Sequence, residues 1–530
     1  MFEVKVRELG GRIGKLVTRH GNIETPFLFP VVDPARQVPS LDVIRSLGFS
    51  GFITNAYLFF KRNRGAVKKI HKEFSWNDVI MTDSGGYQIL VYGDIEVDNK
   101  TIVTYQKEIE TDVGVILDVP TGTKMSWEEA ARAVEETYRR GIEALPLIMD
   151  SNQLWVYPVQ GAPYRDLLIK VAIQARKLPY DIYAVGSPTV LLEKYKYSKL
   201  IELVAIARLH LPPSKPLHVF GVGHPMIIPF LVAVGGDLFD SASYILYARN
   251  GRYMLETGTK DVKELEYFPC NCQVCSRYEP REVLELPSEK RVELLAIHNL
   301  HVLIKELKLV KQAIKEGRLW ELLEYRSKAH PSLHEAFEVV KKYATKLLEK
   351  YSSTVNPGGR ALLLIDSDSE FNPRVKMNVR RALQMGLKRA RGKTVILIPA
   401  YRKPYNHQTE YVVIENVLRD RDDVEAFFIH PILGLITPRL SSTYPYYQHE
   451  TRITSEIINP NKLVALIKRL ASAGAKRLIL IEAGWLKRGL YEQIQRRLKE
   501  LREAVVICKI NEISSLLPPS PSPPSPSQPQ

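Results

Sequence analysis

Cysteine is scarce in this sequence, with only four among 530 residues. A chain of this size with so few cysteines is unlike the small secreted proteins that depend on a disulfide framework. Three of the four nevertheless lie close together, at Cys270, Cys272 and Cys275, in a polar loop. Buried structural thiols are rarely grouped in this way, so the cluster predicts a metal site.

Long apolar runs are also missing, and none approaches the roughly 18 residues that a transmembrane helix needs. Residues 1–21 alternate charged and apolar side chains and lack the apolar core and cleavage site of a secretory signal. Hydrophobic residues form 45% of the chain and charged residues 25%, as is typical of globular proteins. We therefore expect a soluble, cytoplasmic protein that does not contact a membrane.

Acidic residues are outnumbered, since 59 Asp and Glu stand against 74 Lys and Arg and give a formal net charge of +15. This excess favours a polyanionic partner, because neutralised phosphates release condensed counterions. A lysine-rich protein from a thermophile would show a similar excess without such a partner. The charge therefore favours nucleic acid but does not identify which kind.

The chain is too long for one ordinary core, which predicts a large domain followed by a smaller one. Short β-branched or aromatic runs alternate with amphipathic stretches up to about residue 255. Eight parallel βα units predict an α/β fold with a closed (β/α)8 TIM barrel. The eight expected strands are 27–31, 52–55, 79–82, 113–117, 154–159, 182–185, 217–220 and 237–239.

The expected domains follow from changes in composition along the chain. Residues 1–350 should form the barrel domain with an inserted zinc-binding subdomain at about 265–300, ending in long helices over 291–350. A linker at 351–358 should lead to a smaller α/β domain at 359–512, and the Pro/Ser-rich tail at 513–530 should be disordered. Strand candidates in the second domain are 361–365, 394–399, 426–430, 477–482 and 504–508.

Polar residues directly follow the expected barrel strands. In a parallel barrel they would share the C-terminal face, where active sites form. Two of them are aspartates beside glycine-rich turns, and a pair of carboxylates suits glycosyl transfer, in which one attacks the anomeric carbon and the other moves protons. An aspartate taken alone is more commonly a helix cap or turn residue. The polar residues are Asp83, Asp118, Gln160, Gly186, His224 and Asp240.

The metal motif is Cys270-x-Cys272-x2-Cys275, followed after 22 residues by His298 on an expected helix. Three thiolates and one imidazole complete a tetrahedral Zn2+ shell and leave no open position for a catalytic water. We therefore expect one structural zinc ion per chain. His298 is the weakest member of the set, because a lone helical histidine is as readily a core residue.

Several of these motifs occur together as MTDSGGYQILVYGDIEV (81–97), GVGHPM (221–226), DLFDSASYILYARNGRYM (237–254) and PCNCQVC (269–275) with a later AIHNLH (296–301). With TPFLFPVV (25–32) and ITNAYLFFK (53–61), they resemble the archaeal tRNA-guanine transglycosylases over roughly residues 1–350. The resemblance implies a pentosyltransferase that exchanges guanine 15 in the tRNA D arm for preQ0, in archaeosine biosynthesis, through a covalent aspartyl-ribose intermediate.

The resemblance also assigns roles to single residues. Asp240 matches the nucleophile, Asp83 the general acid/base, and Asp118 the carboxylate that accepts from the N1–H and amino edge of the base. The family usually has a second glycine after Gly186, whereas this chain departs from that pattern and continues with Ser187 and Pro188. The remaining base-contacting positions are Tyr87, which would stack on the ring, Val159, Gln160, Gly161 and Gly186.

The second domain resembles a region shared by archaeal transglycosylases and archaeosine synthase, in the strings IPAYRKPYNHQTEY (398–411) and HPILGLITPRLSSTYPYYQHE (430–450). Ala400 stands where the synthase pattern has a cysteine. Basic stretches at 61–72 and 374–393 could face tRNA phosphates or could be ordinary solvated surfaces.

The resemblance further implies a homodimer with the zinc-bearing region at the contact. No PUA module is evident before the tail, which suggests a separately encoded PUA-domain partner. Two other functions remain open, namely a synthase-like paralogue that acts on preQ0-tRNA and a noncatalytic tRNA-binding subunit. The first would keep an intact second-domain motif and lose the barrel aspartates, and the second would tolerate loss of either aspartate.

Overall fold

The computed structural model describes residues 1–86, 97–122, 124–186, 189–356, 359–419, 421–452, 459–486, 488–498 and 505–517. The chain divides into two compact units, Met1–Ser352 and Ser353–Gln530. Among the described residues, no helix combines the length and the apolar character that crossing a membrane would demand.

Eight parallel strands form the centre of the first unit, in the order β4-β11-β10-β9-β8-β7-β6-β5. The two end strands also meet, because Val31 bridges to Ile53 in parallel and the Val32 N–H donates to the Ile53 carbonyl at 2.8 Å. The sheet is therefore closed, and the expected TIM barrel is confirmed. The strands are β4 (Phe27–Pro30), β5 (Gly51–Asn55), β6 (Val79–Asp83), β7 (Val113–Val115), β8 (Leu154–Val159), β9 (Ile182–Val185), β10 (Leu217–Val219) and β11 (Leu238–Ser241).

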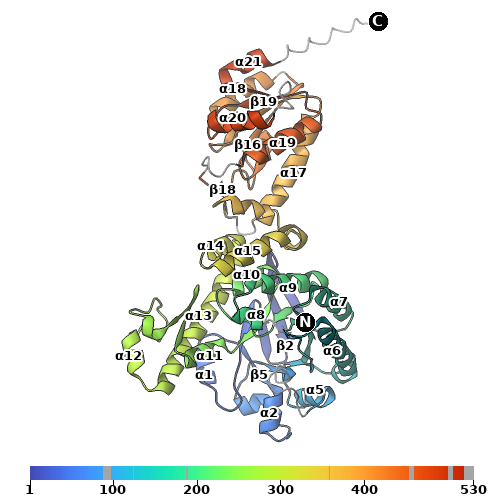
Figure 1. Ribbon diagram of the computed structural model, residues 1–530, viewed down its shortest axis with the longest axis vertical. Coiled ribbons are helices and arrows are strands. Elements are labelled where there is room, and N and C mark those ends of the chain that lie inside the picture. The colour runs from blue at the N-terminus through green and yellow to red at the C-terminus, as the bar shows by residue number, and fades with distance from the viewer. Residues whose placement is uncertain are drawn as a thin grey trace. The chain divides into compact units, whose positions relative to one another are not determined.

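Helices lie between successive strands and surround the barrel, as Figure 1 shows for α5, α6, α7 and α9. The longest of them, α6, begins at a capping box in which the Ser126 side chain accepts from the Glu129 N–H and Glu129 binds back to Ser126. The helices of the barrel within the described residues are α1 (Leu41–Ser46), α2 (Ala56–Arg62), α3 (Ile70–Phe74), α5 (Asn99–Glu108), α6 (Trp127–Ile148), α7 (Arg165–Ala175), α8 (Thr189–Glu193), α9 (Tyr197–His210), α10 (Ile228–Ala233) and α11 (Ser243–Arg249).

An antiparallel sheet that the sequence did not predict precedes the barrel, formed by β1 (Phe2–Glu8), β2 (Gly11–Thr18) and β3 (Gly21–Glu24). Arg12 of β2 ties it to the barrel, since its Nε donates to Oδ1 of the buried Asp237 at 2.8 Å. Asp237 directly precedes β11, so this ion pair lies at the N-terminal end of the strand whose other end reaches the polar face.

The metal-binding region follows α11 and projects from the side of the barrel (Figure 1). It contains the hairpin of β12 (Arg252–Leu255) and β13 (Gly258–Asp261), then α12 (Pro280–Glu285) and the first turns of α13 (Ser288–Glu316). A small apolar cluster that includes Val274, Val283 and Leu294 supports it. The unit ends with α14 (Leu319–Ser327), α15 (Pro331–Tyr343) and α16 (Glu349–Tyr351).

The second unit has a five-stranded sheet in the order β17-β16-β15-β19-β20, with only β17 antiparallel to its neighbour. Residues of β15 alternate between two apolar clusters, so that both faces of the sheet are covered. The strands are β15 (Thr394–Pro399), β16 (Val424–His430), β17 (Gly434–Ile436), β19 (Arg477–Ile481) and β20 (Val505–Cys508), and the main helices are α17 (Pro373–Ala390), α18 (Thr409–Leu418), α19 (Pro460–Ser472) and α20 (Arg488–Arg497).

The expected strand at 361–365 is present as β14 (Leu362–Leu363), which pairs in parallel with β18 (His449–Glu450) and not with the five-stranded sheet. One expectation for the second unit needs correction. The start of the expected disordered tail at residue 513 is wrong, since Ile513–Leu516 forms the short helix α21 and Ile513 is buried in the core of this unit. Residues 518–530 lie outside the described part of the chain.

Candidate active site and metal centre

Three aspartates face one another at the C-terminal ends of the barrel strands. Asp83 ends β6, Asp118 follows β7 and Asp240 lies near the end of β11. Burial, together with the negative charges of Asp118 and Asp240, raises the pKa of Asp83 to about 7. The structure thus brings together three carboxylates from distant parts of the chain, since Asp83 and Asp240 are more than 150 residues apart in the sequence.

Asp83 is held by the neighbouring strand. The Asn55 Nδ2 donates to Oδ2 of Asp83 at 2.8 Å, while the Asn55 Oδ1 accepts from the Leu58 N–H at 2.9 Å as the N-cap of α2. The second bond fixes which end of the amide faces Asp83, because only Nδ2 can donate. A carboxyl group with a pKa near neutrality is suited to proton transfer at neutral pH.

Asp240 has a different environment. Its Oδ1 accepts from the His218 Nε2 at 2.8 Å and from the Gly221 N–H at 3.0 Å. Two donors on one oxygen fix the orientation of this carboxyl group. Sequence reasoning missed His218, although one signal was present, since a histidine stands inside the apolar strand β10 and is completely buried there.

Asp118 is paired with Gln160, whose Nε2 donates to Oδ2 of Asp118 at 2.5 Å. The Gln160 Oε1 accepts from the Thr121 N–H at 3.1 Å, which orients the amide. Burial raises the pKa of Asp118 to about 6, whereas the bond from Gln160 acts in the opposite direction. The carboxylate and the amide therefore form one preorganised polar edge inside the barrel mouth.

Glycines allow this polar edge to form. A Cβ atom at Gly86 would lie 2.2 Å from Oδ1 of Asp118, and one at Gly186 would lie 2.1 Å from Nε2 of Gln160. A side chain at either glycine would therefore displace the polar group beside it.

The other predicted base-contacting residues lie around this edge. Val159 is buried at the end of β8 and its carbonyl accepts from the Gly186 N–H at 3.1 Å. Gly161 has a φ of +124° and donates to the Thr121 hydroxyl at 3.2 Å. Tyr87, Ser187 and Pro188 lie outside the described residues.

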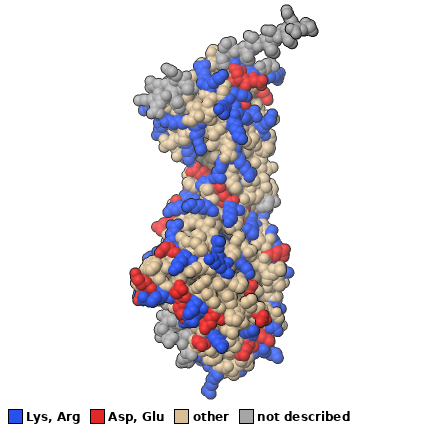
Figure 2. Space-filling view, turned by 90° about the vertical axis from the view of Figure 1, so that its right-hand side faces the viewer, with Lys and Arg blue, Asp and Glu red and all other residues tan. Residues whose placement is uncertain are grey.

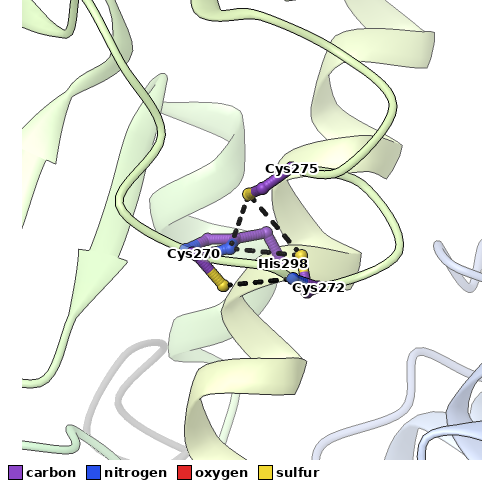
Figure 3. Close-up of side chains that lie close together, drawn as sticks. All are labelled: Cys270, Cys272, Cys275 and His298. Atoms are coloured by element: carbon purple, nitrogen blue, oxygen red, sulfur yellow. Dashed lines mark hydrogen bonds between the residues drawn. The ribbon is translucent and has the colours of Figure 1, made fainter.

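The four expected metal ligands meet in the projecting region (Figure 3), where a loop supplies Cys270, Cys272 and Cys275 and α13 supplies His298. The His298 Nδ1 lies 3.6 Å from the Cys272 Sγ and 3.4 Å from the Cys275 Sγ, and these two sulfurs are 3.6 Å apart. Tetrahedral ligands at zinc-like bond lengths are separated by roughly 3.5–3.8 Å, so the spacing fits one metal ion.

The orientation of His298 supports the same conclusion. Its Nε2 lies 2.9 Å from the Met254 carbonyl and donates to it, which leaves the Nδ1 lone pair directed at the thiols. Metal-binding histidines commonly use their second nitrogen in this way. Tyr253 stacks on the imidazole with ring centroids 3.6 Å apart. The cluster could therefore hold one metal ion and offers no fifth protein ligand among the described residues.

A second group of potential ligands, His20, His71 and Asp112, lies at the opposite end of the barrel, where Asp112 precedes β7. Hydrogen bonds explain its geometry, since Asp112 accepts from the His20 Nδ1 at 2.9 Å and from the Ile80 N–H at 2.9 Å. This group connects the N-terminal sheet to the barrel and is separate from the three aspartates.

Comparison with known proteins decides what kind of barrel this is. The family model described as queuine tRNA-ribosyltransferase matches residues 8–332, which include the three aspartates and all four metal ligands. The chain belongs to this family. Its members are pentosyltransferases, and the matched range ends close to the end of the first compact unit.

Curated relatives of the family extend the match into the second unit. The tRNA-guanine(15) transglycosylase of Saccharolobus solfataricus is 41% identical over 88% of this chain and 95% of its own length. Enzymes of the same name from Aeropyrum pernix and Methanocaldococcus jannaschii are 43% and 39% identical, over 84% and 85% of this chain and 87% and 68% of their own lengths. The predicted resemblance to the archaeal transglycosylases is confirmed.

Proposed function

We propose that this protein exchanges guanine 15 in the D arm of tRNA for preQ0, by double displacement through a covalent aspartyl-ribose intermediate. The observation that carries the proposal is the meeting of Asp83, Asp118 and Asp240 in one buried group at the mouth of the barrel. The names of the relatives, which specify guanine 15, support the choice of substrate. PreQ0 makes this a step of archaeosine biosynthesis.

In the first displacement, Oδ2 of Asp240 attacks C1′ of the ribose, and the bond between C1′ and N9 of guanine breaks. The electron pair of that bond moves to the base, which takes a proton from Asp83. Asp83 is suited to this role because burial and its acidic neighbours raise its pKa to about 7 and keep it protonated up to neutrality.

In the second displacement, N9 of the incoming base attacks C1′ from the vacated side and the ester bond to Asp240 breaks. The proton of N9 returns to Asp83, and Asp240 leaves as a carboxylate. Two inversions at one carbon retain the configuration of the nucleoside. Protons and electron pairs balance over the cycle, so no further reagent is needed.

Asp118 and Gln160 recognise the base in this proposal. The Asp118 carboxylate accepts from the N1–H and exocyclic amino group that guanine and preQ0 share, and Gln160 holds it in place through the 2.5 Å bond. Val159, Gly161 and Gly186 contribute backbone contacts, and Tyr87 stacks on the extruded ring. Both bases present the same edge to Asp118, which explains how one site accepts each of them.

The metal is zinc in a structural role. Three sulfur ligands and one nitrogen complete its shell, and no step of the exchange uses it. Bound zinc would hold the 270–275 loop against α13 and thereby stabilise the projecting region.

The same region forms the contact of a homodimer. Tyr267 of this region is 76% exposed and offers an aromatic side chain for that contact. Sedimentation of the protein as a monomer at micromolar concentration would contradict the dimer.

Basic side chains of the second unit bind tRNA phosphates. Figure 2 shows that the visible face of this unit carries many more Lys and Arg than Asp and Glu. Within the stretch 374–393, Arg374 is buried and Arg389 pairs with Glu425 at 2.9 Å, so these two serve the fold. The exposed basic residues of the stretch are Arg380, Arg381, Lys388 and Arg391.

A separately encoded PUA-domain protein is a further proposed partner. Copurification tests for it, and full activity of the protein alone would exclude a need for it.

The decisive experiment is exchange of radiolabelled guanine into unmodified archaeal tRNA, followed by the same assay with preQ0. Asp240→Ala should abolish incorporation of both bases, because the covalent intermediate cannot form. Incorporation that survives this substitution would remove Asp240 from the nucleophile role.

The synthase-like alternative receives no support from the second unit. Ala400, which stands where the synthase pattern has a cysteine, is buried directly after β15 and supplies no thiol.

A further inference from the structure

His218 lies in the wall of the barrel, in the middle of β10, and is completely buried. Its Nε2 is 2.8 Å from Oδ1 of Asp240. A carboxylate oxygen can only accept a hydrogen bond, so the proton of this bond must reside on Nε2. The Nδ1 atom finds no partner among the described residues. The imidazole therefore makes one hydrogen bond within the described structure, and that bond is to Asp240.

The ring of His218 has little freedom to leave this position. Phe29 of β4 stacks parallel to it, with ring centroids 6.2 Å apart and an interplanar angle of 8°. Phe220, directly after β10, packs on it at a centroid distance of 4.7 Å. A donor held by aromatic packing loses little side-chain entropy when it forms its bond, so it can fix the orientation of the acceptor.

The Gly221 N–H reaches the same Oδ1 atom at 3.0 Å. Two donors thus converge on one oxygen of Asp240, while Oδ2 accepts from none of the described residues. The side chain of Asp240 is 12% exposed, which leaves it accessible at the barrel mouth. The two oxygens of this carboxylate are therefore not equivalent.

We propose that His218 is a positioning residue that holds Oδ1 of Asp240 so that Oδ2 is presented to C1′ of the ribose. This inference rests on the proposed function of Asp240 as the nucleophile. His218 and the Gly221 N–H also stabilise the carboxylate that departs in the second displacement. His218 touches neither the base nor the ribose in this arrangement and acts only through Asp240.

Two substitutions at one buried position separate donation from packing. His218→Phe keeps an aromatic ring between Phe29 and Phe220 but removes the N–H donor, whereas His218→Gln keeps an N–H donor that can reach Asp240. In the guanine-exchange assay, His218→Phe should lower kcat by roughly 10- to 100-fold, the usual effect of losing a hydrogen bond to a charged group. The KM for tRNA should change less than about 2-fold. His218→Gln should recover most of kcat.

Thermal unfolding of each variant shows whether it is folded, and His218→Leu is a second donor-free variant if His218→Phe is not. Equal activity of the Phe and Gln variants, or an effect on KM alone, would overturn the positioning role. Asp240→Ala is assayed in parallel to separate the two ideas. Exchange by Asp240→Ala would refute the proposed function, whereas its inactivity beside a fully active His218→Phe variant would refute only this inference.

Discussion

Gly186 and Gln160 lie in such close contact that a Cβ atom at position 186 would be 2.1 Å from Nε2 of Gln160. That nitrogen is the donor to Asp118, so the absence of a side chain at one strand end permits the hydrogen bond at the next. The relationship explains the position of a glycine that is neither in a turn nor at a positive φ.

Gly186→Ala should therefore displace the Gln160 amide and weaken base binding. We expect the KM for the incoming base to rise by roughly 10-fold, the effect of one lost hydrogen bond to a charged group, with a smaller change in kcat. Steady-state exchange at varied guanine concentration measures this. Gly489→Ala is the control, because a Cβ atom there would meet nothing within 4 Å. An unchanged KM in Gly186→Ala would show that Gln160 does not support base recognition.

Asp83 should reduce stability at neutral and alkaline pH. Its pKa is raised from 3.8 to about 7 on folding, so the folded state binds the proton more tightly than the unfolded state. Stability is therefore lost as pH rises from about 4 through 7, by at most about 4 kcal/mol for a shift of about three units.

Asp83→Asn removes this titration. The variant should be more stable than the wild type in urea unfolding at pH 8, and the difference should shrink toward pH 4. The same variant should be inactive in guanine exchange, since the amide cannot deliver a proton. A stability difference that does not depend on pH would mean that Asp83 titrates normally.

The pH dependence of kcat/KM for exchange should be bell-shaped and narrow. Activity should fall below pH about 6, where Asp118 becomes protonated and can no longer accept from the base, and above pH about 7, where Asp83 loses the proton that guanine needs. Initial rates at low tRNA concentration between pH 5 and 9 provide the measurement. Constant activity from pH 7 to 8.5 would contradict the role of Asp83 as the acid.

Metal content should depend on the three clustered cysteines and His298 but not on the fourth cysteine, Cys508. Cys275→Ser should reduce zinc from one ion per chain to none and lower the melting temperature, because the loop would lose its attachment to α13. Cys508→Ser is the matched control, since Cys508 belongs to the core of the second unit and not to the group of metal ligands. Elemental analysis of both variants tests this, and zinc retained by Cys275→Ser would require a different ligand.

The sequence by itself determined the elements and the chemistry of single residues. Strand positions in the barrel followed from short apolar runs between amphipathic helices, and β8 and β9 have the predicted bounds. The aspartates were recognisable because each stands at or just after the end of an expected strand, and the three cysteine ligands because they lie within six residues of one another. These features depend on near neighbours in the chain, which a sequence displays directly.

Only the tertiary structure decided the contacts between distant segments. Closure of the barrel depends on Val31 and Ile53, and the environment of Asp240 depends on His218 and Gly221. The pairing of β14 with β18 is of the same kind, because the apolar run at 361–365 predicts a strand but not its partner. The pKa values of buried carboxyl groups also required the fold, since burial and neighbouring charge arise only when the chain is packed.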